Sequence, residues 1–174
     1  MTHTALIIAA ALAVPVAAAA QAVTDAQIAS IVVTANQVDI DAGKLASERA
    51  AKPEVKKFGE LMVTDHTGVN KAAVDLVTKL KVTPQDNPTS QSLKAGGDKN
   101  LAHLKSLKGA AFDQAYVDQE VAYHTAVLDA VDKTLIPNAS NAELKALLVK
   151  VRPAFVAHLE HAKQVQASLG GAHE

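Results

Sequence analysis

Three histidines occupy core-facing positions in three segments whose residue spacing predicts helices. His66 falls four residues after Met62 and three before Val69. His124 lies three residues after Val121 and four before Leu128, and His158 lies three after Phe155 and four before Ala162. Because residues three and four apart share one face of a helix, all three imidazoles are predicted to point into the core. A neutral imidazole is a common metal ligand, and a buried one also needs hydrogen-bond partners.

A carboxylate has the corresponding position on a fourth segment. Asp39 lies on the apolar stripe of the first predicted helix, about as far from the turn at Lys52 as His66 is, so an antiparallel hairpin brings the two level. Three histidines and one carboxylate suit a single Zn, Fe or Cu ion. Glu120, one turn before His124, is a further candidate ligand, and a surface position is its alternative.

The same residues have a second interpretation that needs no metal. Imidazole and carboxyl groups can satisfy one another in a closed hydrogen-bond network, and the sequence leaves both alternatives open. Asp65 is predicted to lie on the solvated flank of its helix, with the orientation of an imidazole as the alternative. His161 is predicted to be half exposed, and His103 and His173 to face water.

Four long amphipathic segments must position these groups. They are predicted to begin at Thr24 or Asp25, at Pro53, after Gly109, and at Ser140 or Asn141. Short links join the first to the second and the third to the fourth, which makes each pair antiparallel, whereas a long connection joins the second to the third. The sequence therefore predicts an all-α, ferritin-like four-helix bundle with a long crossover between helices 2 and 3.

Prolines and glycines predict where these helices are interrupted. The first half of the crossover is predicted to be irregular, with a short helix only after the pair Gly96 and Gly97. The third long helix is predicted to stop at Pro137. Pro153 is predicted to kink or locally break the fourth, because proline removes a backbone donor and crowds the preceding turn.

Composition agrees with a helical protein and excludes some kinds of site. Of the 174 residues, 49% are hydrophobic but only 3% aromatic, a mixture that suits closely packed helices. The chain has no cysteine, so disulfides and thiolate ligands are excluded. A net charge of −1 gives no basic face for nucleic acid, and no Ser-His-Asp signature, glycine-rich phosphate loop or HExxH motif is present.

The first residues predict export. Ala5 to Val14 form an apolar run, Pro15 ends it, and small residues follow with cleavage positions after Ala20 and Ala22. Residues 1–22 are therefore predicted to be a signal peptide; a membrane anchor is the alternative, but the run is short for a span. Residues 23–174 are predicted to form a periplasmic bundle domain without a membrane span.

Four stretches of the chain resemble a known family. "NQVDIDAGKLA", "VKKFGELMVTDH", "FDQAYVDQEVAYH" and "RPAFVAHLEHA" look like the bacterial exported family called domain of unknown function 4142, whose members are often labelled outer-membrane proteins. The resemblance covers nearly all of the mature chain and implies a ferritin-like bundle and an exported location, but no chemistry. Its most specific marks are Asp65, His66, Phe112, Asp113, Tyr116, His124, Pro153 and His158.

The ligand pattern argues against a di-iron centre. Di-iron bundles carry Glu-x-x-His pairs on two helices. Here Val63, Val121 and Phe155 stand three residues before the core histidines. Three functions remain as hypotheses: an exported metal-binding protein in metal handling or stress protection, a non-catalytic structural or interaction module, and a redox enzyme. The sequence names no protein partner.

Overall fold

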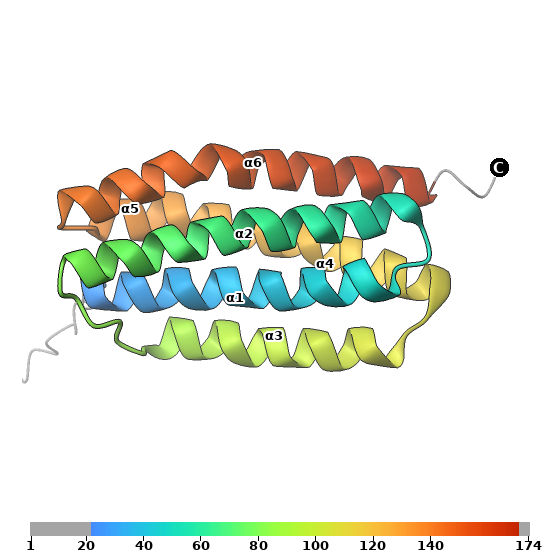
Figure 1. Ribbon diagram of the computed structural model, residues 1–174, viewed down its shortest axis with the longest axis horizontal. Helices are drawn as coiled ribbons and strands as arrows, with labels where there is room; N and C mark the ends of the chain where they lie inside the picture. Colours follow the sequence, from blue (N-terminus) through green and yellow to red (C-terminus); the bar gives the residue numbers. More distant parts are fainter. Residues whose placement is uncertain (1–21, 171–174) are drawn as a thin grey trace, which may run out of the picture.

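The computed structural model describes residues 22–170, and this part of the chain is helical and contains no strand. The elements are α1 (Asp25–Arg49), α2 (Pro53–Lys79), α3 (Pro88–Ser106), α4 (Gly109–Ala130), the π-helical turn η1 (Val131–Leu135), α5 (Ile136–Asn138) and α6 (Ala142–Gly170). Figure 1 shows α1, α2, α4 and α6 side by side, with α3 along the outer side of α1. The predicted all-α bundle with a crossover between helices 2 and 3 is confirmed.

The predicted signal peptide lies almost entirely outside the described residues, and His173 lies outside them as well. Within residues 22–170, no helix combines the length and hydropathy needed to cross a bilayer.

The first hairpin begins and turns where the sequence predicts. Thr24 caps α1: its side chain accepts a hydrogen bond from the Gln27 backbone, and the Gln27 side chain accepts one from the Thr24 backbone. This reciprocal pair satisfies two donors that a helix start leaves free. Pro53 occupies the first turn of α2, where its missing N–H has no intrahelical partner to lose.

Two glycines let α1 and α2 approach closely. A Cβ atom built on Gly43 would lie 2.8 Å from the Gly59 carbonyl oxygen, and one built on Gly59 would lie 2.8 Å from the Gly43 carbonyl oxygen. Neither backbone can yield to a side chain at that distance without moving its helix. This contact lies between the turn and the level of Asp39 and His66, so it fixes how closely those two side chains meet.

Two carboxylates hold the hairpin turns from other helices. Asp113 of α4, which is fully buried, accepts hydrogen bonds from the backbone N–H groups of Ala51 and Lys52 at 2.9 and 2.8 Å. Asp25 of α1 does the same for the two residues before α6, at 2.9 and 3.0 Å. Hydrogen bonds to charged acceptors are stronger than neutral ones, so these contacts fix the register of both hairpins.

The crossover is more regular than predicted. α3 begins at Pro88 and runs through the glycine pair, so the prediction of an irregular first half is wrong. Asn87 explains the early start, since its side chain accepts from two backbone N–H groups of the first turn, with proline at the first helical position. Gly97 is needed for packing: a Cβ there would lie 2.7 Å from a Val38 methyl carbon of α1.

The helical run that begins with α4 ends within one residue of Pro137, as predicted. Pro137 lies inside α5, just after the π-helical turn in which the Ile136 N–H bonds to the Val131 carbonyl, and helical backbone continues only to Asn138. A proline favours a helix end because it lacks a backbone donor and its ring crowds the preceding turn.

α6 continues through Pro153, so of the two predicted alternatives the local break is wrong, and the helix bends gently along its length (Figure 1). The carbonyl that this proline deprives of a donor belongs to Val149, which is 53% exposed, so water can replace the missing N–H.

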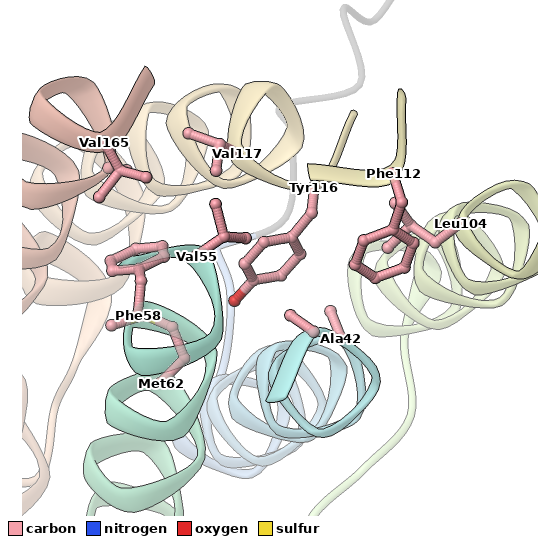
Figure 2. Packing of buried hydrophobic residues seen from close by; sticks show 11 residues of the cluster. Ala42, Val55, Phe58, Met62, Leu104, Phe112, Tyr116, Val117 and Val165 are labelled. Carbon is pink, nitrogen blue, oxygen red and sulfur yellow. The ribbon is translucent and has the colours of Figure 1, made fainter. Parts of the chain in front are cut away.

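The interior consists of two apolar clusters. The first core cluster lies toward the α1–α2 turn; Figure 2 shows its side chains pointing toward one another from several helices. Its buried members are Ala42, Ala46, Val55, Phe58, Met62, Leu104, Phe112, Tyr116, Val117, Ala162 and Val165. The second core cluster lies toward the other end, with Ile28, Ile31, Val32, Ala73, Val131, Leu135, Ala139, Leu144 and Leu148. Along every long helix, the residues between these two sets include polar ones.

The close contact of α1 and α2 generates the first prediction. Gly59→Ala should lower the free energy of unfolding by about 1–3 kcal/mol, because the new methyl group meets backbone across the interface. Gly68→Ala, in the same helix with nothing within 4 Å of its Cβ position, should instead raise it by about 0.5–1 kcal/mol. Urea denaturation measures both. Equal effects of the two substitutions would contradict the close approach.

Candidate metal centre

Five buried ionisable side chains from four helices meet between the two core clusters. We call them the polar layer: Asp39 of α1, His66 of α2, Glu120 and His124 of α4, and His158 of α6. None is more than 3% exposed. The structure thus brings together all the residues that the sequence proposes as ligands, and it buries Glu120 rather than leaving it on the surface. Their role as ligands stays a prediction.

The three histidines lie within reach of one point. Their ring centroids are separated by 5.6 Å for His66 and His124, 5.1 Å for His66 and His158, and 5.4 Å for His124 and His158. Each offers one ring nitrogen, and these three atoms lie within 4.8 Å of one another. Metal–nitrogen bonds are about 2.0–2.1 Å long, so nitrogens on one ion are about 3–4 Å apart. Small side-chain rotations would close the difference.

The carboxylates adjoin this group through His124. Asp39 Oδ2 lies 3.2 Å from His66 Nε2 and 3.7 Å from His124 Nε2, and Glu120 Oε2 lies 3.4 Å from His124 Nδ1. Asp39, Glu120 and His124 form a second set of three whose ligand atoms lie within 4.8 Å of one another. The polar layer is therefore one continuous group of potential ligands.

Each histidine has one ring nitrogen held by an acceptor. His66 Nδ1 lies 2.8 Å from Asn36 Oδ1, and His158 Nε2 lies 2.9 Å from Asp65 Oδ2. His124 Nδ1 lies 3.2 Å from the Glu120 backbone carbonyl oxygen. Because these partners are acceptors, each of these nitrogens carries the proton of a neutral ring. The other nitrogen of each ring then presents a lone pair, which is the arrangement found in metal-ligating histidines.

Those second ring nitrogens have no hydrogen-bond partner among the described residues. They are His66 Nε2, His124 Nε2 and His158 Nδ1. The 3.2 Å contact between His66 Nε2 and Asp39 is close enough for an ion pair, but it lacks the direction of a hydrogen bond. An unsatisfied buried polar group costs about 1–3 kcal/mol. A closed network is therefore not formed by these side chains alone, whereas a metal ion would satisfy all three lone pairs.

Burial favours neutral imidazole at two of the three histidines. The pKa of His66 is lowered from 6.5 to about 2, first by burial and then by repulsion from His124 and His158. The pKa of His158 is also lowered, chiefly by burial, although its hydrogen bond to Asp65 opposes the change. Metal ligation requires neutral imidazole, so burial favours the correct protonation state at these two rings.

Burial disfavours the charged forms of the two carboxyl groups of the layer. It raises the pKa of Glu120 to about 7, and burial followed by the charge of Glu120 raises the pKa of Asp39 well above its usual value. A proton or a cation can offset the repulsion of the two carboxylates, so a bound ion would displace a proton from the pair.

Several residues that serve the layer were not recognised in the sequence. Asn36, 3% exposed, orients His66 and is itself fixed by a hydrogen bond to the Val32 carbonyl. Its position three residues before Asp39, on the same helical face, was the available signal. Tyr116, one turn before Glu120, has a fully buried hydroxyl without a partner in the described structure.

The remaining polar candidates divide as follows. Asp65 combines both of its predicted alternatives, since it is 38% exposed yet holds His158. His161 is half-buried, as predicted, and its ring packs against Phe58 with centroids 5.0 Å apart. His103 is exposed, as predicted.

Comparison with known protein families gives a match for most of the chain. Residues 11–165 match the family described as domain of unknown function (DUF4142). The chain belongs to the DUF4142 family. The matched residues of this DUF4142 protein include the whole polar layer, and the resemblance seen in the sequence is confirmed.

Two further comparisons bear on this DUF4142 protein. A search of curated proteins found no match. A solved structure described as CopM in the Cu(II)-bound form is similar in fold, with a TM-score of 0.64 and 16% identity, over 85% of this chain and 99% of that one.

The neutral state of His66 generates a prediction for the metal-free DUF4142 protein. Between pH 6.5 and about 2 the unfolded chain binds a proton at His66 that the folded chain does not, so this residue lowers stability as the pH falls. The stability of wild type relative to His66→Leu should therefore decrease below about pH 6.5, by up to about 1.4 kcal/mol per pH unit.

Urea denaturation with a chelator present, repeated across this pH range, measures the difference. The same substitution at the exposed His103 controls for the loss of an imidazole. If the free energies of unfolding of wild type and His66→Leu change in parallel with pH, the His66 ring is not kept neutral by burial.

Proposed function

We propose that this DUF4142 protein binds one transition-metal ion in the polar layer. His66, His124 and His158 supply three ring nitrogens, and Asp39 or Glu120 supplies an oxygen. The observation that carries the proposal is the pairing within each ring: one nitrogen is held by an acceptor, and the other has no partner among the described residues. The three rings also lie close together in the interior, with centroids 5.1–5.6 Å apart, so an ion between them could meet a lone pair from each.

The donor set favours a particular group of ions. Imidazole suits Zn, Cu and Fe, whereas sites for Mg and Ca are built from oxygen ligands. For a nitrogen and oxygen site, Cu(II) binds more tightly than Zn(II) or Fe(II) in the general order of stability. CopM, described in its Cu(II)-bound form, has the same fold at 16% identity. We therefore expect Cu(II) to bind most tightly, with Zn and Fe as weaker alternatives.

The cellular role that we propose follows from the start of the chain as well as from the layer. The apolar run from Ala5 to Val14, followed by Pro15 and small residues, supports a cleaved signal peptide of residues 1–22 and a periplasmic domain of residues 23–174. An exported protein that holds one ion in a closed interior suits metal handling or protection against metal stress.

One observation favours a second function, a structural or interaction module without metal. The Asn36 contact of His66, the Asp65 contact of His158 and the backbone contact of His124 satisfy part of the layer internally. In this alternative the polar groups specify the register of the bundle, and water or small rearrangements satisfy the rest.

Thermal melting of the protein without a His tag separates the two functions. Cu(II), Zn(II) and Fe(II) should each raise the melting temperature of wild type, because only the folded chain has the site. An ion at 100 times its dissociation constant adds about 2.7 kcal/mol. His66→Leu and His158→Ala should lose most of this shift, whereas His103→Leu, which changes an exposed histidine, should keep it.

If none of the three ions changes the melting temperature of wild type, the metal-binding hypothesis is wrong and the structural or interaction module remains. In that case replacing any one of the three core histidines by Ala should still destabilise by about 1–3 kcal/mol, through partners left unpaired. His66→Leu should then cost less than His66→Ala, since leucine fills the space without a polar atom.

A further inference from the structure

An apolar cavity of about 130 Å³ adjoins the polar layer. Its walls come from the second-core-cluster end of α1, α4, η1 and α6 and from α3, and they are almost entirely apolar. Asn36, Asp39 and His66 line it as well and form its polar end. The cavity therefore joins a dry apolar space to the edge of the layer.

The π-helical turn η1 forms part of this wall. Val131 and Leu135, its first and last residues, both line the cavity. A π turn is a rare element that occurs frequently at functional sites, and it shifts the side chains that follow it relative to a regular helix. Its position here is a second observation, independent of the polar layer, that marks this end of the bundle.

A surface depression adjoins the cavity. It lies between α3 and α4, is more open, and shares Thr89, Leu93 and Tyr123 with the cavity. Thr89 is exposed, so this wall of the cavity reaches the protein surface beside α3.

The lining determines what can bind. No Lys or Arg is among the residues that line the cavity, so an anionic ligand would lose its hydration without a counter-charge. Apolar cavities of about 150 Å³ in proteins hold benzene. The size and lining therefore suit a neutral molecule with one aromatic ring.

The polar end favours a ligand that donates a hydrogen bond. The hydroxyl of Tyr123 already donates to the Ala35 carbonyl, Asn36 Nδ2 to the Val32 carbonyl, and His66 Nδ1 to Asn36. Acceptors remain in excess, since Asn36 Oδ1 has a second lone pair and His66 Nε2 has no partner in the described structure. A ligand hydroxyl can use them.

We propose that this cavity binds a small neutral aromatic molecule with one hydroxyl group, of the phenol class. The ring lies among the apolar side chains, and the hydroxyl donates to the acceptors of the polar end. This binding goes beyond the proposed metal function and does not depend on it, because the cavity is formed by the folded bundle alone.

The test uses the full chain treated with chelator, with phenol, fluorobenzene and benzoate as probes. Phenol should bind saturably and shift the methyl NMR signals of Val131 and Leu135. Fluorobenzene, similar in size but without a donor, should bind at least about 10-fold more weakly, the effect of one hydrogen bond worth about 1.4 kcal/mol. Benzoate should not bind. No saturable phenol binding, or equal affinity for phenol and fluorobenzene, would overturn the proposal.

Two variants separate the cavity from the metal centre. Ala130→Leu fills the cavity and should abolish phenol binding while the metal-induced rise in melting temperature remains. His158→Ala, which does not line the cavity, should keep phenol binding and lose that rise. If Ala130→Leu does not fold, Leu93→Phe narrows the cavity from α3 and serves in its place. If phenol binds Ala130→Leu, or Leu93→Phe in its place, as tightly as it binds wild type, phenol does not bind in this cavity.

Discussion

Five ionisable groups are held in the interior of the bundle, and the surrounding structure reduces the cost of burying them. Burial lowers the pKa of His66 and His158 and so favours their neutral forms, and one nitrogen of each of the three rings has a fixed acceptor. Apolar clusters on both sides keep the local dielectric low, which strengthens each satisfied contact and penalises each unsatisfied one. The second nitrogen of each ring has no partner in the described structure, and the closeness of the three rings is the basis of the proposed metal centre.

The geometry of the layer is set by contacts outside it. Asp113 and Asp25 fix the two hairpin turns, and the contact of Gly43 with Gly59 sets the spacing of α1 and α2. None of these residues is a candidate ligand. The folded chain can therefore present the three lone pairs before any ion arrives, and the conformational entropy of arranging the ligands is lost on folding rather than on binding.

The sequence predicts the helices and the inward direction of the ligands because both follow from a local spacing of three and four residues. It does not predict the extent of α3, since the reason for Gly97 is a Val38 side chain on another helix. The π turn and the continuity of α6 through Pro153 also depend on their surroundings. Asn36 was missed because its position on the same helical face as Asp39 is a weak signal until its partner, His66, is seen across the interface.

The burial of the layer has a consequence for kinetics. With every member at most 3% exposed, an ion held there would have little contact with solvent, and the apolar cavity beside Asp39 and His66 would exclude a charged chelator. Release would require the helices to separate locally, so the rate of release would depend on the stability of the fold rather than on the strength of the coordination bonds. The residence time of the ion would then follow the opening rate of the bundle, and excess chelator would remove it at a rate independent of the chelator concentration.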